Sequence, residues 1–233
     1  MQRALGDVRA LTFDMFGTVL DLSGTLVPAL REFLLARGLP ADPAALWDDW
    51  RTRQRIEQHQ DTILMLGHRG YLDSARRALV HTFRRHAVPH DESDVLGLVQ
   101  AFYRLRPFDD AQQGLLRLGE RYRLVALSNG DQPLVEHLVG NGVDAEFHQC
   151  LSVDRVGRFK PHPSVYRMAA AELGHEPGEI LMVASHAFDI LGARACGFRG
   201  AYVNRYGLPY EESSLLPNLE ARDFGELADT LFG

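Results

Sequence analysis

The sequence contains little cysteine, no long apolar run and no cluster of basic residues. Cys150 and Cys196 have no partners at zinc-ligand spacing, so we expect two small core residues and no zinc site. No apolar segment approaches the roughly 18–20 residues of a membrane helix. Because no signal peptide is recognised either, we expect a reducing, cytoplasmic location. The net charge of -6 gives no reason to expect nucleic-acid binding.

The segment from Val8 to Val19 contains one aspartate and no second one. It is predicted to be an apolar strand that ends in Asp14 and is followed by a turn. A carboxylate at the carboxyl end of a buried parallel strand lies where α/β proteins bind ligands. That position suits either a nucleophile or a metal ligand. The next residue but one is Phe16 and not a second aspartate, and this difference bears on the chemistry that Asp14 can perform.

Apolar strand patterns alternate with helical patterns over most of the 233 residues. This alternation predicts an α/β fold with a doubly wound parallel sheet. The predicted strands are Arg9–Asp14, Arg123–Ser128, Ile180–Ser185 and Gly200–Asn204. Helices are predicted from Pro133 onward and over Ser164–Leu173 and Phe188–Cys196.

The stretch from residue 22 to residue 106 shows only helical patterns. Its predicted helices are Leu26–Arg37, Pro43–Gln58, Tyr71–His86 and Asp91–Leu105. We therefore expect a core domain of residues 1–21 and 107–233, interrupted by a helical cap domain of residues 22–106. A cap over the ligand end of a sheet can exclude water from a reaction.

Polar residues form four clusters at the predicted strand ends or between them. The clusters are Asp14 with Thr18, Ser128-Asn129-Gly130, Lys160-Pro161, and Ser185-His186 with Asp189. In a doubly wound sheet these ends meet at one crevice. Asp14 could attack a carbon or phosphorus centre, and Lys160 would hold it ionised. Ser128, Asn129 and the amides that open the Pro133 helix predict an anion site.

These clusters, in this order, resemble the four motifs of the haloacid dehalogenase superfamily, and within it the type II L-2-haloacid dehalogenases. The similarity extends to Trp50-Arg51, Tyr103–Phe108 and Leu151–Asp154. It implies a Rossmann-like core with an inserted cap. Phosphatases of the superfamily carry Asp-x-Asp in the first motif and bind Mg²⁺ with further acidic residues. Phe16 replaces their second aspartate, and halide leaves without protonation, so the resemblance implies a dehalogenase without metal or cofactor.

The resemblance also implies roles for individual residues. Asp14 would displace halide from C2 of a 2-haloacid, and water would then open the ester to give a 2-hydroxy acid. The substrate-binding residues would be Met15 and Phe16 through their amides, Ser128 and Ser185, with Arg51 and Asn129 around the halide. The residues that orient Asp14 would be Thr18, Lys160 and Tyr166, while Asp189 would position water. A homodimer is also expected, because relatives of this type are often dimers.

The fourth motif departs from the expected Ser-Ser-Asn-x-Trp-Asp, because it reads Ala184-Ser185-His186-Ala187-Phe188-Asp189. A histidine can act as a general base, so we hypothesise that His186 activates water with help from Asp189 or another carboxylate. Hydrolysis of fluoroacetate or azetidine-2-carboxylate would use the same ester and stays an alternative. A phosphatase is disfavoured by Phe16, and a silent binding protein by the intact set of polar residues.

Overall fold

The computed structural model describes residues 5–65 and 68–233. The chain divides into two compact units. The sheet unit comprises Met1–Leu20 and Pro107–Gly233, and the helical unit comprises Asp21–Arg106. Across the described residues, every helix is too short or too polar to cross a membrane.

The sheet unit contains a six-stranded parallel sheet with strand order β5-β4-β1-β6-β7-β8. The strands are β1 (Ala10–Phe13), β4 (Arg123–Ser128), β5 (Gln149–Ser152), β6 (Ile180–Ala184), β7 (Arg199–Val203) and β8 (Leu219–Ala221). The α/β fold and its four predicted strands are thus confirmed. The sequence pattern missed β5 and β8, which are short edge strands with polar residues in them.

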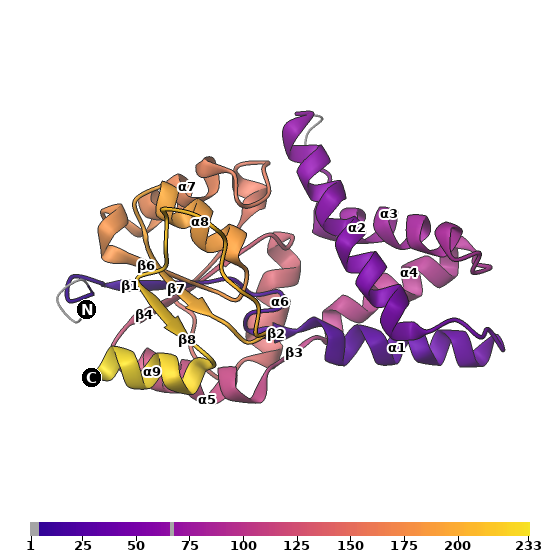
Figure 1. The fold of residues 1–233 in the computed structure, drawn as a ribbon, viewed down its shortest axis with the longest axis horizontal. Coiled ribbons are helices and arrows are strands. Elements are labelled where there is room, and N and C mark those ends of the chain that lie inside the picture. Colours follow the sequence, from indigo (N-terminus) through magenta and orange to yellow (C-terminus); the bar gives the residue numbers. More distant parts are fainter. Residues whose placement is uncertain (1–4, 66–67) are drawn as a thin grey trace. The chain divides into compact units, whose positions relative to one another are not determined.

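Helices cover both faces of this sheet, which explains why its central strands are mostly apolar. Every residue of β1 and of β6 is buried. Figure 1 shows α7 (Pro163–Leu173) and α8 (Ala187–Ala195) on one side, and α5 (Asp109–Gly119) and α9 (Phe224–Phe232) on the other. Phe13 of β1 stacks on Phe224 at a ring-centroid distance of 6.0 Å, which fixes α9 on the central strand. In the strand order, β1 lies between β4 and β6, so the carboxyl ends of these three parallel strands are neighbours.

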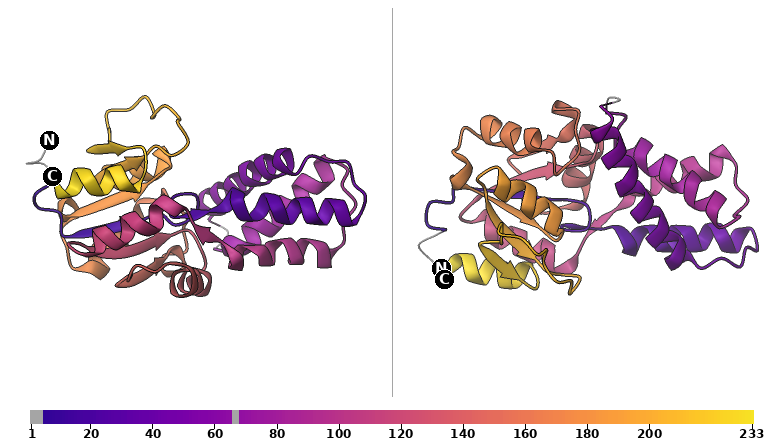
Figure 2. Two further views of the ribbon diagram at one scale, coloured as in Figure 1. Left: turned by 90° about the horizontal axis from the view of Figure 1, so that it is seen from below. Right: turned by 45° about the horizontal axis from the view of Figure 1, so that its top comes forward.

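The described residues of the helical unit form four α-helices, which Figure 2 shows from two further sides. They are α1 (Leu22–Ala36), α2 (Pro43–Ile63), α3 (Tyr71–Arg85) and α4 (Glu92–Gln100), followed by the 3-10 turn η2 (Ala101–Arg104). Asp42 caps α2 ahead of Pro43, and Asp91 forms a capping box with Asp94. The predicted helix over Asp91–Leu105 is thus shorter, because α4 gives way to a 3-10 turn at Ala101.

The chain passes between the two units at β2 (Leu20–Asp21) and β3 (Arg106–Pro107), which form a separate two-stranded sheet. On the sheet-unit side, the amide of Phe108 donates to the carbonyl of Val19 at 2.9 Å. The two crossings are therefore held together by backbone hydrogen bonds.

Candidate active site

Asp14 directly follows β1, where its amide donates to the carbonyl of Val183 in β6 at 3.0 Å. The loop after it closes on the carbonyl of Met15, which accepts hydrogen bonds from the amides of Val19 at 3.1 Å and Leu20 at 2.8 Å. Gly17 has φ +84, a left-handed conformation that favours glycine. This tight loop returns the side chain of Thr18 to Asp14.

Among the described residues, three side chains contact the carboxylate of Asp14, whose side chain is only 10% exposed. The hydroxyl of Thr18 donates to Oδ2 at 2.8 Å, and Nδ1 of His186 lies 3.2 Å from the same oxygen. The ammonium of Lys160 donates to Oδ1 at 3.2 Å. The predicted clusters around Asp14 are therefore brought together from three separate loops.

Lys160 bridges two carboxylates in the interior of the sheet unit. Its Nζ also donates to Oδ2 of Asp189 at 2.7 Å, and the other oxygen of Asp189 accepts from the hydroxyl of Tyr166 at 2.7 Å. A Cβ on Gly192 would lie 2.6 Å from that hydroxyl, so the glycine lets α8 approach Tyr166 closely. The hydroxyl of Tyr166 thus contacts Asp189 and not Asp14. Tyr166 can therefore orient Asp14 only indirectly, through Asp189 and Lys160.

Burial and the ammonium of Lys160 give the carboxyl groups of Asp14 and Asp189 different pKa values. Burial opposes ionisation of Asp14, but the charge of Lys160 and the hydrogen bonds from His186 and Thr18 outweigh it and hold the pKa of Asp14 well below its usual range. Burial raises the pKa of Asp189 to about 6, with Lys160 opposing and the charge of Asp14 adding to the effect. Although burial opposes it, the charges of Asp14 and Asp189 raise the pKa of Lys160. Asp14 is consequently an ionised carboxylate in a nearly dry site.

The remaining predicted residues of the sheet unit support this cluster through short hydrogen bonds. The amide of Ser185 donates to the hydroxyl oxygen of Thr18 at 2.9 Å. Asn129 accepts from the amide of Lys160 at 2.8 Å, and Ser128 accepts from the amide of Gly130 at 3.0 Å. Ser128 ends β4, the direct neighbour of β1 in the sheet. These contacts tie the second and fourth clusters to the loops around Asp14.

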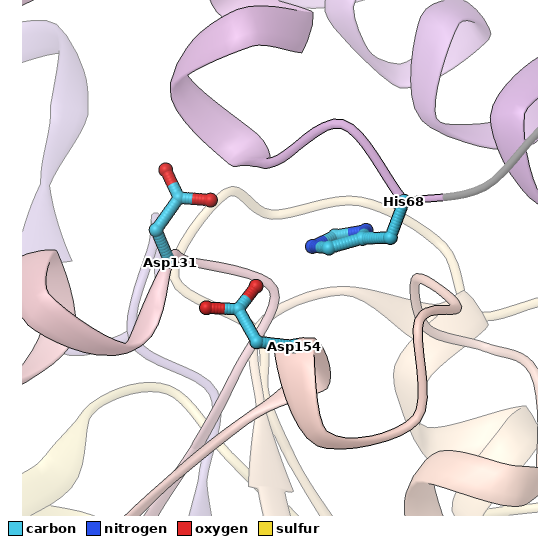
Figure 3. Close-up of side chains that lie close together, drawn as sticks. All are labelled: His68, Asp131 and Asp154. Atoms are coloured by element: carbon cyan, nitrogen blue, oxygen red, sulfur yellow. The ribbon is translucent and has the colours of Figure 1, made fainter.

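One part of the expected anion site, the first amide of the Pro133 helix, is already occupied in the structure. The first amide of α6 (Gln132–Gly142), that of Gln132, donates to Oδ2 of Asp154 at 2.7 Å. Figure 3 shows the carboxylates of Asp131, which precedes α6, and of Asp154, in the 3-10 turn η3 (Val153–Arg155). Because a carboxylate of the chain itself already uses this amide, a bound anion would meet negative charge there.

Arg51 belongs to the helical unit, on α2. Its guanidinium donates to Oε1 of Gln54 at 3.0 Å and to the hydroxyl of Tyr71 at 3.1 Å. Gln54 is fully buried between α2 and α3. The side chain of Arg51 is therefore held in place by polar partners of its own unit, and its part in halide binding stays a prediction.

Sequence reasoning missed Arg205 and Tyr206, which follow β7. The guanidinium of Arg205 donates to the carbonyl of Thr18 at 3.1 Å, and the hydroxyl of Tyr206 donates to the carbonyl of Gly17 at 2.8 Å. Asp14 was identified because it is a polar residue at the carboxyl end of a parallel strand. The same criterion would have identified Arg205 and Tyr206, which follow the strand predicted to end at Asn204. A second missed signal is that Lys160 is the only lysine in the sequence.

Comparisons with known proteins identify the family of the chain. The family model for haloacid dehalogenase-like hydrolases matches residues 8–197, which is most of the chain. The chain belongs to this family. The family assignment made from the four motifs is thereby confirmed.

Individual members of the haloacid dehalogenase-like hydrolases resemble the chain over nearly its full length. Haloacetate dehalogenase H-2 of Moraxella sp. (strain B) is 30% identical over 213 residues, covering 91% of this chain and 92% of that protein. The crystal structure of the L-2-haloacid dehalogenase RSc1362 superposes with a TM-score of 0.89 at 26% identity, covering 97% and 99% of the two chains. The L-2-haloacid dehalogenase of Xanthobacter autotrophicus with chloropropionic acid covalently bound gives a TM-score of 0.82 at 27% identity, with coverage of 97% and 99%.

Proposed function

We propose that the protein hydrolyses short 2-haloacids to 2-hydroxy acids and halide through an ester on Asp14. The observation that carries the proposal is an ionised, buried carboxylate at the end of β1, paired with Lys160, with Phe16 where a phosphatase would have its acid. The names of the relatives, which include haloacetate and L-2-haloacid dehalogenases, support the substrate class. The relative with covalently bound chloropropionic acid supports a covalent intermediate.

The reaction has two steps. In the first, an oxygen of the Asp14 carboxylate attacks C2 of the haloacid, and the carbon–halogen bond breaks as halide departs with its electron pair. In the second, water attacks the carbonyl carbon of the Asp14 ester and gives up a proton to a base. The ester bond then breaks, which releases the 2-hydroxy acid and restores the carboxylate.

The polar network around Asp14 serves both steps. Lys160 and Thr18 hold the two oxygens of the carboxylate in fixed directions at 3.2 Å and 2.8 Å, so that its attack costs little reorganisation. Asp189, itself held by Tyr166, keeps the ammonium of Lys160 in place. Met15, Phe16, Ser128 and Ser185 would bind the substrate carboxylate, and Asn129 would contact the halide.

The residues at this site do not suit a divalent cation. The ammonium of Lys160 already pairs with an oxygen of Asp14 at 3.2 Å and with an oxygen of Asp189 at 2.7 Å, and the other oxygen of Asp189 accepts from Tyr166. Mg²⁺ requires oxygen ligands in octahedral geometry and would be repelled by this fixed positive charge. The proposed reaction therefore proceeds without a metal. The proposal also includes a homodimer, as the family resemblance implies, and a cytoplasmic location, as the scarcity of cysteine predicts.

The proposal is tested by measuring ion release from L- and D-2-chloropropionate and fluoroacetate, with and without EDTA. We expect halide release from at least one of these acids at a rate that EDTA leaves unchanged. Fluoride release would favour the fluoroacetate alternative. Absence of halide from all three, together with Mg²⁺-dependent phosphate release from simple esters, would overturn the proposal.

His186 is proposed as the base of the second step. An ionised carboxylate only accepts hydrogen bonds, so Nδ1 carries the proton that faces Asp14. To act as the base, the ring would have to be neutral, with Nε2 as its basic nitrogen. The ring contacts those of Phe188 and Tyr206, at centroid distances of 5.5 Å and 6.1 Å. These contacts help to hold the imidazole beside the Asp14 carboxylate, whose carbon water attacks in the second step.

Replacing His186 with glutamine is expected to preserve the first step and slow the second. Loss of a general base lowers kcat by about 10²–10⁴-fold. A single equivalent of halide should appear rapidly, and intact-protein mass spectrometry should show the ester accumulating. His137→Gln, at an exposed position on α6, is the control. Turnover of His186→Gln at the wild-type rate without ester would exclude this role.

A further inference from the structure

Arg205 connects three parts of the sheet unit at the base of the Asp14 loop. Its guanidinium forms a two-pronged ion pair with Asp110 at the start of α5, at 2.8 Å and 3.0 Å. One of these two guanidinium nitrogens, Nη2, also donates to the carbonyl of Thr18 at 3.1 Å. The planar group lies 3.9 Å above the ring of Phe108. The Arg205 side chain is 10% exposed, so these contacts are largely shielded from water.

The partners of Arg205 are themselves fixed. Asp110 also accepts from the amide of Phe224, at 3.0 Å, which ties it to the start of α9. The amide of Phe108 donates to the carbonyl of Val19, the residue after Thr18. Arg205 thus links the start of α5 and, through Asp110, the start of α9 to the backbone of the Asp14 loop.

Thr18 is the link between Arg205 and the nucleophile. Its carbonyl accepts from Arg205, its hydroxyl donates to Asp14 at 2.8 Å, and its hydroxyl oxygen accepts from the amide of Ser185 at 2.9 Å. A shift of the Thr18 backbone would therefore move the hydroxyl that fixes one oxygen of Asp14. Misplacement of a reacting group by about 1 Å can cost about 10²-fold in rate.

We propose that Arg205 is a positioning residue for Asp14, acting through the backbone of Thr18. This role rests on the proposed dehalogenase function, because it assigns Arg205 to the alkylation step. A purely structural ion pair would require only Asp110 as partner. The contact with the Thr18 carbonyl and the position of Cζ 3.9 Å from the centre of the Phe108 ring instead fix the guanidinium in place, in a geometry that a lysine cannot reproduce.

A double-mutant cycle with Arg205→Lys and Thr18→Val tests the proposal. Arg205→Lys should lower kcat for halide release by about 10–100-fold with a change in KM below about threefold. In the Thr18→Val background, which lacks the hydroxyl, the same change should have less than about threefold further effect. Arg222→Lys, at an exposed arginine on the same unit, is the matched control and should retain wild-type kinetics.

Equal fold-losses in both backgrounds, or an unchanged kcat in Arg205→Lys, would overturn the role of Arg205. Arg205→Gln provides a second variant if the lysine variant folds poorly. Hydrogen exchange at the amide of Ser185 gives a readout that needs no substrate, and we expect it to be faster in Arg205→Lys than in wild type. Inactivity of the wild type on every haloacid would refute the proposed function, whereas unchanged exchange would refute the positioning role.

Discussion

Asp14→Asn is expected to abolish halide release, with kcat lower by more than about 10⁴-fold. The amide keeps the size of the side chain but cannot attack C2 as an anion, and no other carboxylate of the site is placed to replace it. Asp189 is engaged by Lys160 and Tyr166 on its two oxygens. Halide release and covalent labelling by 2-chloropropionate, followed by mass spectrometry, measure the effect.

Asp7→Asn is the matched control, because Asp7 is an exposed aspartate close to the same strand. It should retain wild-type kcat. An Asp14→Asn variant that folds normally and retains more than about a tenth of the wild-type rate would show that another group performs the displacement.

Lys160→Met is expected to produce the largest loss of stability of any single change at the site. It removes the ammonium that balances two buried carboxylates, at 3.2 Å from Asp14 and 2.7 Å from Asp189. Breaking a buried ion pair by removing one partner costs about 3–5 kcal/mol in the free energy of unfolding. Urea denaturation at about pH 7 measures this loss, and Arg222→Met, at an exposed cation, should change stability by less than about 0.5 kcal/mol.

The loss in Lys160→Met should depend on pH in a defined direction. In the wild type the pKa of Asp14 is held below its unfolded value, so its ionisation stabilises the fold above that value and this contribution is lost as the pH falls through the folded pKa. Without Lys160, burial instead favours the protonated carboxyls. Between about pH 7 and about pH 4 the wild type keeps the Asp14 contribution, and protonation of Asp189, whose pKa is raised to about 6, relieves part of its burial cost. The variant gains more over this range because both of its carboxyls lack the opposing ammonium, so the difference in unfolding free energy between variant and wild type should shrink. A difference that grows on acidification would contradict the assigned charges.

Most of the sheet could be predicted because its central strands are mostly apolar and are followed by polar residues. The strand predicted over Arg123–Ser128 matches β4 residue for residue, and Ile180–Ser185 exceeds β6 by one residue. The edge strand β5 escaped prediction because two of its four residues are Gln149 and Ser152, which give no apolar run. Its pairing with β4, and not its own composition, makes it a strand.

The candidate site could be predicted in its members but not in all its contacts. Strand-end geometry explains why Asp14, Lys160 and His186 meet. The sequence could not show that Tyr166 reaches Asp189, because this contact depends on the absence of a side chain at Gly192, on a different helix. Nor could it show that Asp154 accepts from the amide of Gln132, because the two residues are brought together only by the pairing of β4 with β5.

A single turnover in water labelled with heavy oxygen tests the central claim most directly, with enzyme in excess over 2-chloropropionate. If water attacks the carbonyl carbon of an Asp14 ester, the first product carries unlabelled oxygen from the carboxylate, and the peptide containing Asp14 gains the label. Peptide mass spectrometry should place this label on Asp14. Labelled 2-hydroxy acid in the first turnover, with an unlabelled Asp14 peptide, would mean that water attacks C2 directly and would contradict the account.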